Sequence, residues 1–142
     1  MSYQKIFIAL MGASAAHAEC SRKEFATLGL TEGQPKILYI LLGKDGVVQK
    51  DLAEICGIRQ STLTVLLGKL EEQGYIYKET CYVSGRKRAF EIYLTEQGRE
   101  MAEKLNDAVE ELECKSFDGF SEQEKVSLLE MLARVEENLK KN

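Results

Sequence analysis

The chain has 142 residues, of which 44% are hydrophobic and 30% charged, and its formal net charge is −4. This composition indicates a globular protein, and the length suits one domain, or one domain plus a dimerisation extension. The single proline and the lack of any Pro/Ser/Gly-rich run predict no linker and no disorder away from the ends. The apolar stretch 6–18 is interrupted by polar residues and is too short to span a bilayer, so we interpret it as part of a structural helix rather than as a signal peptide.

The negative charge is concentrated in the C-terminal part of the chain. Residues 1–94 carry 12 basic and 10 acidic side chains, whereas residues 95–142 carry 7 basic and 13 acidic ones. Contact with phosphates depends on a local basic face rather than on net charge. The overall acidity therefore does not exclude a nucleic-acid partner for the first two thirds of the chain.

The first two predicted helices lie before residue 44. The segment Tyr3 to Thr27 is rich in Ala, Ile, Leu and Met, and Gly29 follows it as a stop signal. Thr31 is the predicted N-cap of the next helix, which has Pro35 in its first turn and ends at Gly43. The apolar side chains that we expect this helix to bury are Ile37, Leu38, Ile40, Leu41 and Leu42.

A helix-turn-helix is predicted from residue 49 to residue 74. The short helix QKDLAEIC (49–56) is expected to pack through Leu52, Ala53, Ile55 and Cys56, and Gly57 supplies the tight turn that follows. In the second helix Leu63, Leu66, Leu67 and Leu70 share the core face, and the opposite face carries Gln60, Ser61, Thr64 and Lys69. Small polar side chains opposite a buried stripe are typical of a DNA-recognition helix.

A basic β-hairpin is predicted directly after the second helix. Strands are expected over 76–82 and 89–94, with the bend at Ser84-Gly85 and with Phe90, Ile92 and Leu94 on the buried face. The hairpin tip carries Arg86, Lys87 and Arg88. A helix-turn-helix followed by such a hairpin is the layout of a winged helix, which predicts binding to double-stranded DNA.

Two further helices are predicted at the C-terminal end. Thr95 is the expected N-cap of a helix whose apolar seam is Met101, Leu105, Ala108 and Leu112. The pattern breaks at 116–119, and Ser121 with Glu124 predicts a capping box for a last helix with the seam Leu128, Leu132, Val135 and Leu139. These helices do not fit into a compact winged-helix core, so we expect them to form a homodimer interface together with the first helix.

The predicted architecture is therefore mainly α with a small β-hairpin, in one domain over residues 1–142. Residues 30–94 form the winged helix-turn-helix core, and residues 1–29 and 95–142 form N- and C-terminal dimerisation helices.

Two segments of the chain carry a resemblance to a known family, GIRQSTLTVLLGKLEEQGYI (57–76) and GRKRAFEIYLTEQG (85–98). Through them the chain resembles the multiple antibiotic resistance regulator (MarR) family of bacterial transcription factors. The resemblance covers nearly the whole chain. It implies an obligate homodimer that binds pseudo-palindromic operators and usually represses nearby genes. It also implies release from DNA by a small-molecule effector or by thiol oxidation.

The resemblance also assigns roles to individual residues. It implies that Gln60, Ser61, Thr62 and Thr64 face the major groove, that Arg59 lies near phosphate at the helix entrance, and that Arg86, Lys87 and Arg88 form the wing tip. Three positions depart from the family pattern. Arg86 stands where the family often has Asp, Val65 where it often has Arg, and Gly68 where Asp is common. The chain therefore has fewer charged base readers than the pattern.

The four cysteines, Cys20, Cys56, Cys81 and Cys114, form no C-x-x-C pair, which predicts free thiols in a reducing, cytoplasmic compartment. Cys56 is expected in the core, and Cys20 and Cys114 are expected to be buried on the dimer helices. Cys81 lies near basic residues that would favour its thiolate. Cys81 and Cys20 are therefore the candidates for a redox switch, with structural burial as the commoner alternative.

Other functions are less well supported by the sequence. A winged helix can act as a protein-interaction module, and charges at a hairpin tip also prevent edge-to-edge pairing of strands. His17 and Cys20 share a helix face, but a metal site would need more ligands, and we expect none. The chain has no Gly-rich phosphate loop, H-E-x-x-H or G-x-S-x-G motif, so we expect neither an enzyme nor a cofactor.

Overall fold

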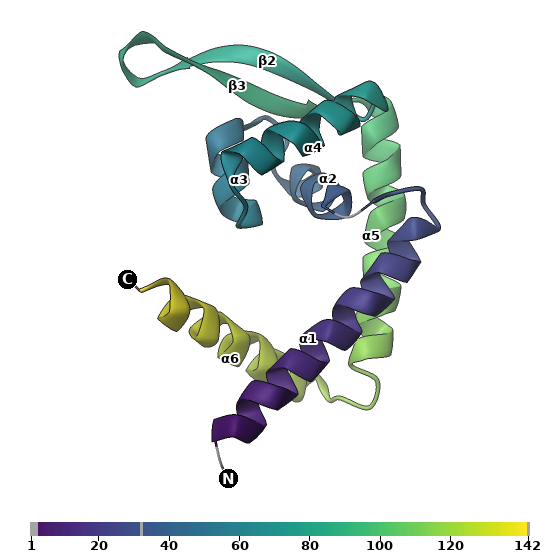
Figure 1. Ribbon diagram of the computed structural model, residues 1–142. Helices are drawn as coiled ribbons and strands as arrows, with labels where there is room; N and C mark the ends of the chain where they lie inside the picture. Colours follow the sequence, from purple (N-terminus) through teal and green to yellow (C-terminus); the bar gives the residue numbers. More distant parts are fainter. Residues whose placement is uncertain (1–2, 32, 142) are drawn as a thin grey trace.

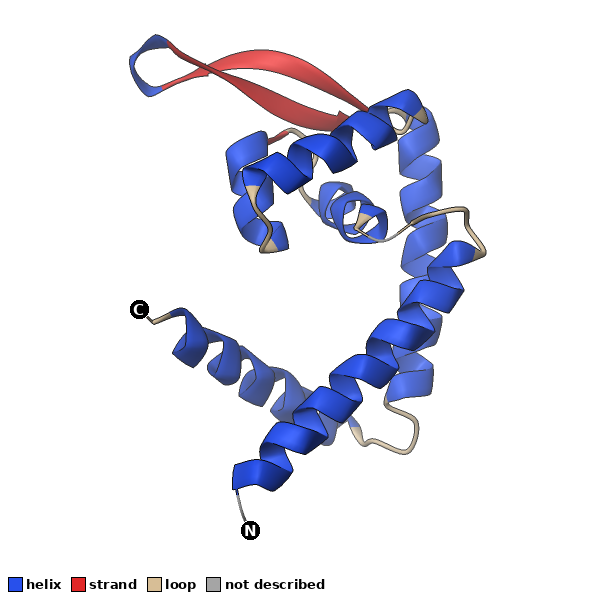
Figure 2. Ribbon diagram, viewed as in Figure 1, coloured by secondary structure: helices blue, strands red, loops and turns tan. Residues whose placement is uncertain are grey.

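The computed structural model describes residues 3–31 and 33–141, and it is mostly helical with one small antiparallel sheet (Figures 1 and 2). The predicted fold class is confirmed. The elements in chain order are α1 (Tyr3–Ala26), α2 (Gln34–Gly43), β1 (Val47–Val48), α3 (Gln49–Cys56), α4 (Gln60–Glu72), β2 (Ile76–Val83), β3 (Lys87–Leu94), α5 (Glu96–Ser116) and α6 (Glu122–Lys140).

Within the described residues the sheet has three strands in the order β1-β3-β2, all antiparallel. The hairpin of β2 and β3 was predicted, and β1 was not. Two valines are too short a run to show the alternation that marks a strand. Val47 pairs with Ile92, and the Gly46 amide donates to the Ile92 carbonyl at 2.8 Å. The third strand thereby holds the base of the hairpin against α2 and α3.

The core lies between the sheet and helices α2 to α5. Leu63, Leu67 and Leu70 of α4 are fully buried, as predicted, and Leu66 is half-buried. The other fully buried apolar side chains are Ile37, Leu38, Leu41, Leu52, Ile76, Ile92 and Leu105. Two expectations of burial are wrong, because Ile55 is 42% exposed and Phe90 is 37% exposed. Phe90 is in β3, and the hairpin of β2 and β3 extends beyond the helices toward its tip (Figure 1).

Three predicted helix caps have different outcomes. The Thr95 side chain accepts from the Gly98 amide, and Ser121 forms a reciprocal capping box with Glu124, both as predicted. Thr31 does not cap α2, because Gly33 occupies the N-cap position. Instead the Thr31 amide donates to Oε1 of Gln34 at 3.0 Å. Gln34 is buried, and its Nε2 donates to Gln73 Oε1 at 2.9 Å, which joins the start of α2 to the residue after α4.

The outer helices leave apolar side chains exposed. Helix α5 packs against α1 and α2, whereas α6 contains no buried residue. The exposed large apolar side chains of α1 are Ile6, Phe7, Ile8, Leu10 and Met11, and those of α6 are Val126, Leu129, Met131, Leu132, Val135 and Leu139. No helix in residues 3–31 and 33–141 is long and apolar enough to cross a membrane.

Gly98 allows the first turn of α5 to lie directly on the turn between α4 and β2. A Cβ at this position would overlap the Tyr75 carbonyl oxygen and lie 2.8 Å from its carbonyl carbon, and these backbone atoms cannot move aside without shifting the turn. Gly68, within α4, has no such neighbour.

We predict that Gly98→Ala lowers the free energy of unfolding by about 2 kcal/mol, because the added methyl group overpacks a backbone contact. The matched variant Gly68→Ala should raise it by about 0.5–1 kcal/mol, since alanine favours a helix interior over glycine. Urea unfolding of both variants measures the difference. Equal stabilities for the two would contradict the contact at Gly98.

Candidate nucleic-acid interface

Helices α3 and α4 form the predicted helix-turn-helix. The turn is made by Gly57, which has φ 68° and ψ 33°, a left-handed conformation that glycine adopts without a steric cost. The Gly57 amide donates to the Glu54 carbonyl and the Ile58 amide to the Ala53 carbonyl, which closes the end of α3. The core contacts of Leu63, Leu67 and Leu70 then set which face of α4 points to solvent.

The outer face of α4 carries the predicted readers of DNA. Their side chains are all exposed: Arg59, Gln60, Ser61, Thr62, Thr64 and Lys69. The Thr64 hydroxyl donates to the Gln60 carbonyl at 2.9 Å and accepts from Gln49 Nε2 at 3.0 Å. Gln49 joins α3 to the exposed face of α4, a role that sequence patterns did not indicate. The pair is fifteen residues apart, so no helical spacing could have revealed it.

The wing carries the predicted basic residues at its tip. Val83 pairs with Lys87 across the turn Ser84–Arg86, in which both Gly85 and Arg86 have φ 72°. Arg86, Lys87 and Arg88 are exposed. The wing extends past α3, so the basic tip and the polar face of α4 are displayed by one folded unit (Figure 1).

The base of the wing is held by hydrogen bonds to neighbouring elements. Thr95 follows β3 and binds the turn between α4 and β2. Its amide donates to the Tyr75 carbonyl at 3.0 Å, and its hydroxyl donates to the Gly74 carbonyl at 2.6 Å. Asp45 accepts from the Leu94 amide at 2.8 Å and pairs with Arg99 at 2.7 Å. These contacts set the position of β2 and β3 relative to α4 and α5.

The surroundings of Cys56 agree with expectation, and those of Cys81 do not. Cys56 is buried, as predicted, and burial raises the pKa of its thiol. Within the protomer Cys114 is exposed and Cys20 is half-buried, and their predicted burial at a dimer interface stays a prediction. Desolvation, followed by the nearby Glu91 carboxylate, raises the pKa of Cys81. The strand places an acid rather than a base next to this thiol, so its surroundings disfavour the thiolate.

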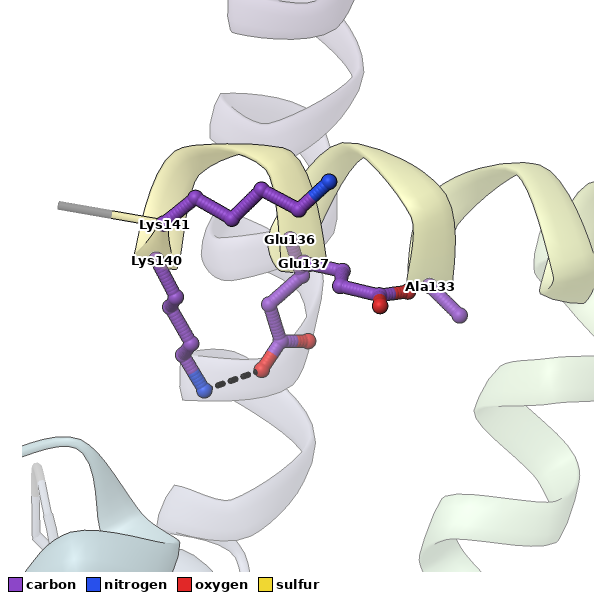
Figure 3. Close-up of a pocket in the computed structure, with 5 residues that line it drawn as sticks. All are labelled: Ala133, Glu136, Glu137, Lys140 and Lys141. Carbon is purple, nitrogen blue, oxygen red and sulfur yellow. Dashed lines mark hydrogen bonds and ion pairs between the residues drawn. The ribbon is translucent and has the colours of Figure 1, made fainter.

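Two surface depressions lie on α5 and α6, away from the outer face of α4 and the wing tip. One, of about 450 Å³, is formed along α6, where Lys140 pairs with Glu136 at 2.6 Å (Figure 3). It is lined by Ala133, Glu136, Glu137, Lys140 and Lys141. The other, of about 280 Å³, lies between α5 and α6. In the described part of the chain, no three His, Cys, Asp or Glu side chains gather to hold a metal ion.

The comparisons with known proteins agree with this geometry. Residues 28–87 match the sequence model of the MarR family. The uncharacterized HTH-type transcriptional regulator YybA of Bacillus subtilis (strain 168) is 30% identical over 122 residues, which cover 86% of this chain and 80% of that protein. The chain therefore belongs to the MarR family and is a transcriptional regulator of that family.

Two solved structures share the whole fold. A Listeria monocytogenes protein assigned to the MarR family, crystallised with a 26mer DNA, has a TM-score of 0.82 at 26% identity and covers 98% of this chain and 90% of that one. The transcriptional regulator SlyA has a TM-score of 0.81 at 28% identity, with 94% and 93% covered. The winged-helix architecture is thus common to this chain and to a relative that was solved on DNA.

We predict that Cys81 reacts with iodoacetamide more slowly in the folded protein than in the urea-unfolded chain near neutral pH. A raised pKa leaves less thiolate at a given pH, and the thiolate is the nucleophile. Glu91→Gln should accelerate the folded-state reaction, and Glu54→Gln, which changes a carboxylate on α3, should not. Peptide mass spectrometry measures each site. A Cys81 rate unaffected by Glu91→Gln would contradict the electrostatic cause.

Proposed function

We propose that this protein is a homodimeric, sequence-specific DNA-binding repressor of nearby genes, located in the cytoplasm. The observation that carries the proposal is that one folded unit displays two surfaces suited to DNA. The exposed polar face of α4 and the basic wing tip belong to one folded unit, joined at Gly74–Tyr75 and Thr95. Such a unit can place a helix in a major groove while its hairpin lies along the flanking backbone or minor groove.

Within this proposal the two surfaces have different tasks. Gln60, Ser61, Thr62 and Thr64 read base edges or bind nearby phosphates, and the fixed Thr64 hydroxyl leaves Gln60 and Ser61 as the more adaptable readers. The cations bind phosphate without regard to sequence and supply most of the affinity. These cations are Arg59, Lys69, Arg86, Lys87 and Arg88.

The proposed homodimer uses residues 1–29 and 95–142. Exposed apolar side chains along α1 and α6, such as Phe7 at 66% and Leu139 at 76%, are costly in a monomer because water contacts them. A two-fold partner that covers these helices would remove this cost. It would also place two α4 helices in successive major grooves, about 34 Å apart, which matches a pseudo-palindromic operator.

Release from DNA is the regulatory part of the proposal. A small molecule that binds between the dimer helices and the winged-helix core would favour dimers with the wrong spacing of the two α4 helices, provided that it binds the two shapes with different affinity. Thiol oxidation is the second route. The raised pKa of Cys81 makes this residue a slow sensor, and Cys20, half-buried on α1, is the other candidate.

We predict that the double variant Arg86→Ala, Arg88→Ala binds all duplexes more weakly and reduces the salt slope of binding by up to about four, because a dimer loses four cations. Gln60→Ala should instead change the preference among operators with the salt slope unchanged. Fragments selected from the source genome by wild-type protein supply the operators, and titrations at several salt concentrations supply the slopes.

Two results would count against this function. Selection that enriches no fragment would favour a protein-interaction module over a sequence-specific DNA binder. A double wing variant that binds as tightly as wild type at every salt concentration would remove the wing from the interface. Lys44→Ala, which removes one cation per protomer from the turn before β1, is the control for loss of positive charge outside the wing.

We predict that Leu132→Glu combined with Leu139→Glu converts the dimer to monomers in sedimentation equilibrium, because burying two charges per protomer without partners opposes association. Arg134→Glu introduces the same acid on the opposite face of α6 and should leave the dimer intact. A stable dimer of the double variant would show that this stripe of α6 is not the interface.

A further inference from the structure

The two faces of the wing differ in charge. Residues paired across an antiparallel hairpin lie on the same face, and neighbours along a strand lie on opposite faces. The face that continues from the buried Ile92 toward the tip pairs Thr80 with Phe90 and Tyr82 with Arg88, and it also carries Lys78. We call this set, Lys78, Thr80, Tyr82, Arg88 and Phe90, the inner wing face.

Phe90 lies at the centre of the inner wing face and contacts two cations. The Lys78 ammonium lies 5.8 Å from the ring centroid, and the Arg88 guanidinium carbon lies 5.6 Å from it. Both distances are within the range of attraction between a cation and an aromatic ring. Phe90 is 37% exposed, and the neighbouring Tyr82 is 72% exposed. An aromatic side chain that contributes little to the core thus holds two cations beside it.

The opposite face of the wing carries Lys87 at the tip and is acidic between the tip and the base. Glu79 pairs directly with Glu91, an arrangement of like charges that destabilises a hairpin. Desolvation, followed by Glu91, raises the pKa of Cys81, and desolvation, followed by Glu91 and Glu79, raises the pKa of Tyr93. Negative charge on this face would repel a phosphate backbone, whereas the inner wing face would attract one.

We propose that the phosphate backbone of duplex DNA docks on the inner wing face, and that Phe90 is the residue that positions Lys78 and Arg88 for it. This inference deepens the proposed function and rests on it. Long cationic side chains lose rotamer freedom when they bind, and a ring that already restrains them lowers this loss. The Glu79–Glu91 pair sets the orientation by making the other face unfavourable for DNA.

The test compares Phe90→Leu with Phe90→Tyr in the full-length protein, with mixed-sequence duplex DNA and the selected operator as probes. Leucine keeps an apolar side chain and removes the ring, and tyrosine keeps the ring. We expect Phe90→Leu to weaken binding to both duplexes roughly three- to tenfold, since a dimer has two wings, and Phe90→Tyr to restore it. Tyr77→Leu, which removes an aromatic ring from the opposite face, should have no effect.

A double-mutant cycle separates positioning from a structural role. In a background that carries Lys78→Gln and Arg88→Gln, Phe90→Leu should have less than about a twofold effect, because the cations that it positions are gone. An equal loss in both backgrounds would overturn the positioning role while leaving the proposed function intact. So would wild-type affinity of Phe90→Leu. Failure of wild-type protein to bind either duplex would overturn both proposals.

A second pair of variants tests which face of the wing binds DNA. Lys78→Gln should weaken binding to mixed-sequence duplex and lower the salt slope by about two, one cation per wing of the dimer. Glu79→Gln, one residue away on the other face, should leave the slope unchanged. A slope that responds to Glu79→Gln and not to Lys78→Gln would mean that DNA docks on the opposite face.

Discussion

The contact between the start of α5 and the turn at Gly74–Tyr75 determines how the two halves of the molecule are joined. Helix α4 ends and β2 begins at this turn, while β3 ends and α5 begins at Thr95. Three hydrogen bonds meet there: Thr95 donates to the Tyr75 and Gly74 carbonyls and accepts from the Gly98 amide. Because Gly98 has no side chain, the helix lies directly on the turn. Any movement of α5 therefore acts on the proposed recognition helix and the wing together.

This connection gives the proposed regulation a physical route. An effector or partner that shifts α5 relative to α1 would move the base of the wing through Thr95, and Asp45 links the same helix to the turn before β1 through Arg99. The Asp45–Arg99 pair is exposed enough for solvent to screen it, so it aligns the elements more than it stabilises them. The shared buried core of α2, α4 and β3 would let the winged-helix unit move as one body during such a shift.

The distribution of charge over single faces of the molecule, rather than the net charge, decides whether a polyanion can bind. A net charge of −4 coexists with a wing whose tip carries three consecutive cations. The strand alternation then separates Lys78 and Arg88 from Glu79 and Glu91, although these residues are neighbours in the chain. The net charge of the segment adds the charges of both faces, whereas a polyanion that binds the wing contacts only one face.

Local patterns in the sequence determined the helix-turn-helix, the hairpin and two helix caps. Helix α3 begins at Gln49 and ends at Cys56, as predicted, and Thr95 and Ser121 cap their helices. These features could be predicted because each depends on a few consecutive residues. Tertiary structure alone decided the pairing of β1 with β3, the Gln34–Gln73 and Gln49–Thr64 bonds, the exposure of Phe90 and the acid beside Cys81. The pairings and hydrogen bonds join residues that are distant in the sequence, and the exposure of Phe90 depends on where β3 leaves the core. The periodicity of a single segment carries no information about either.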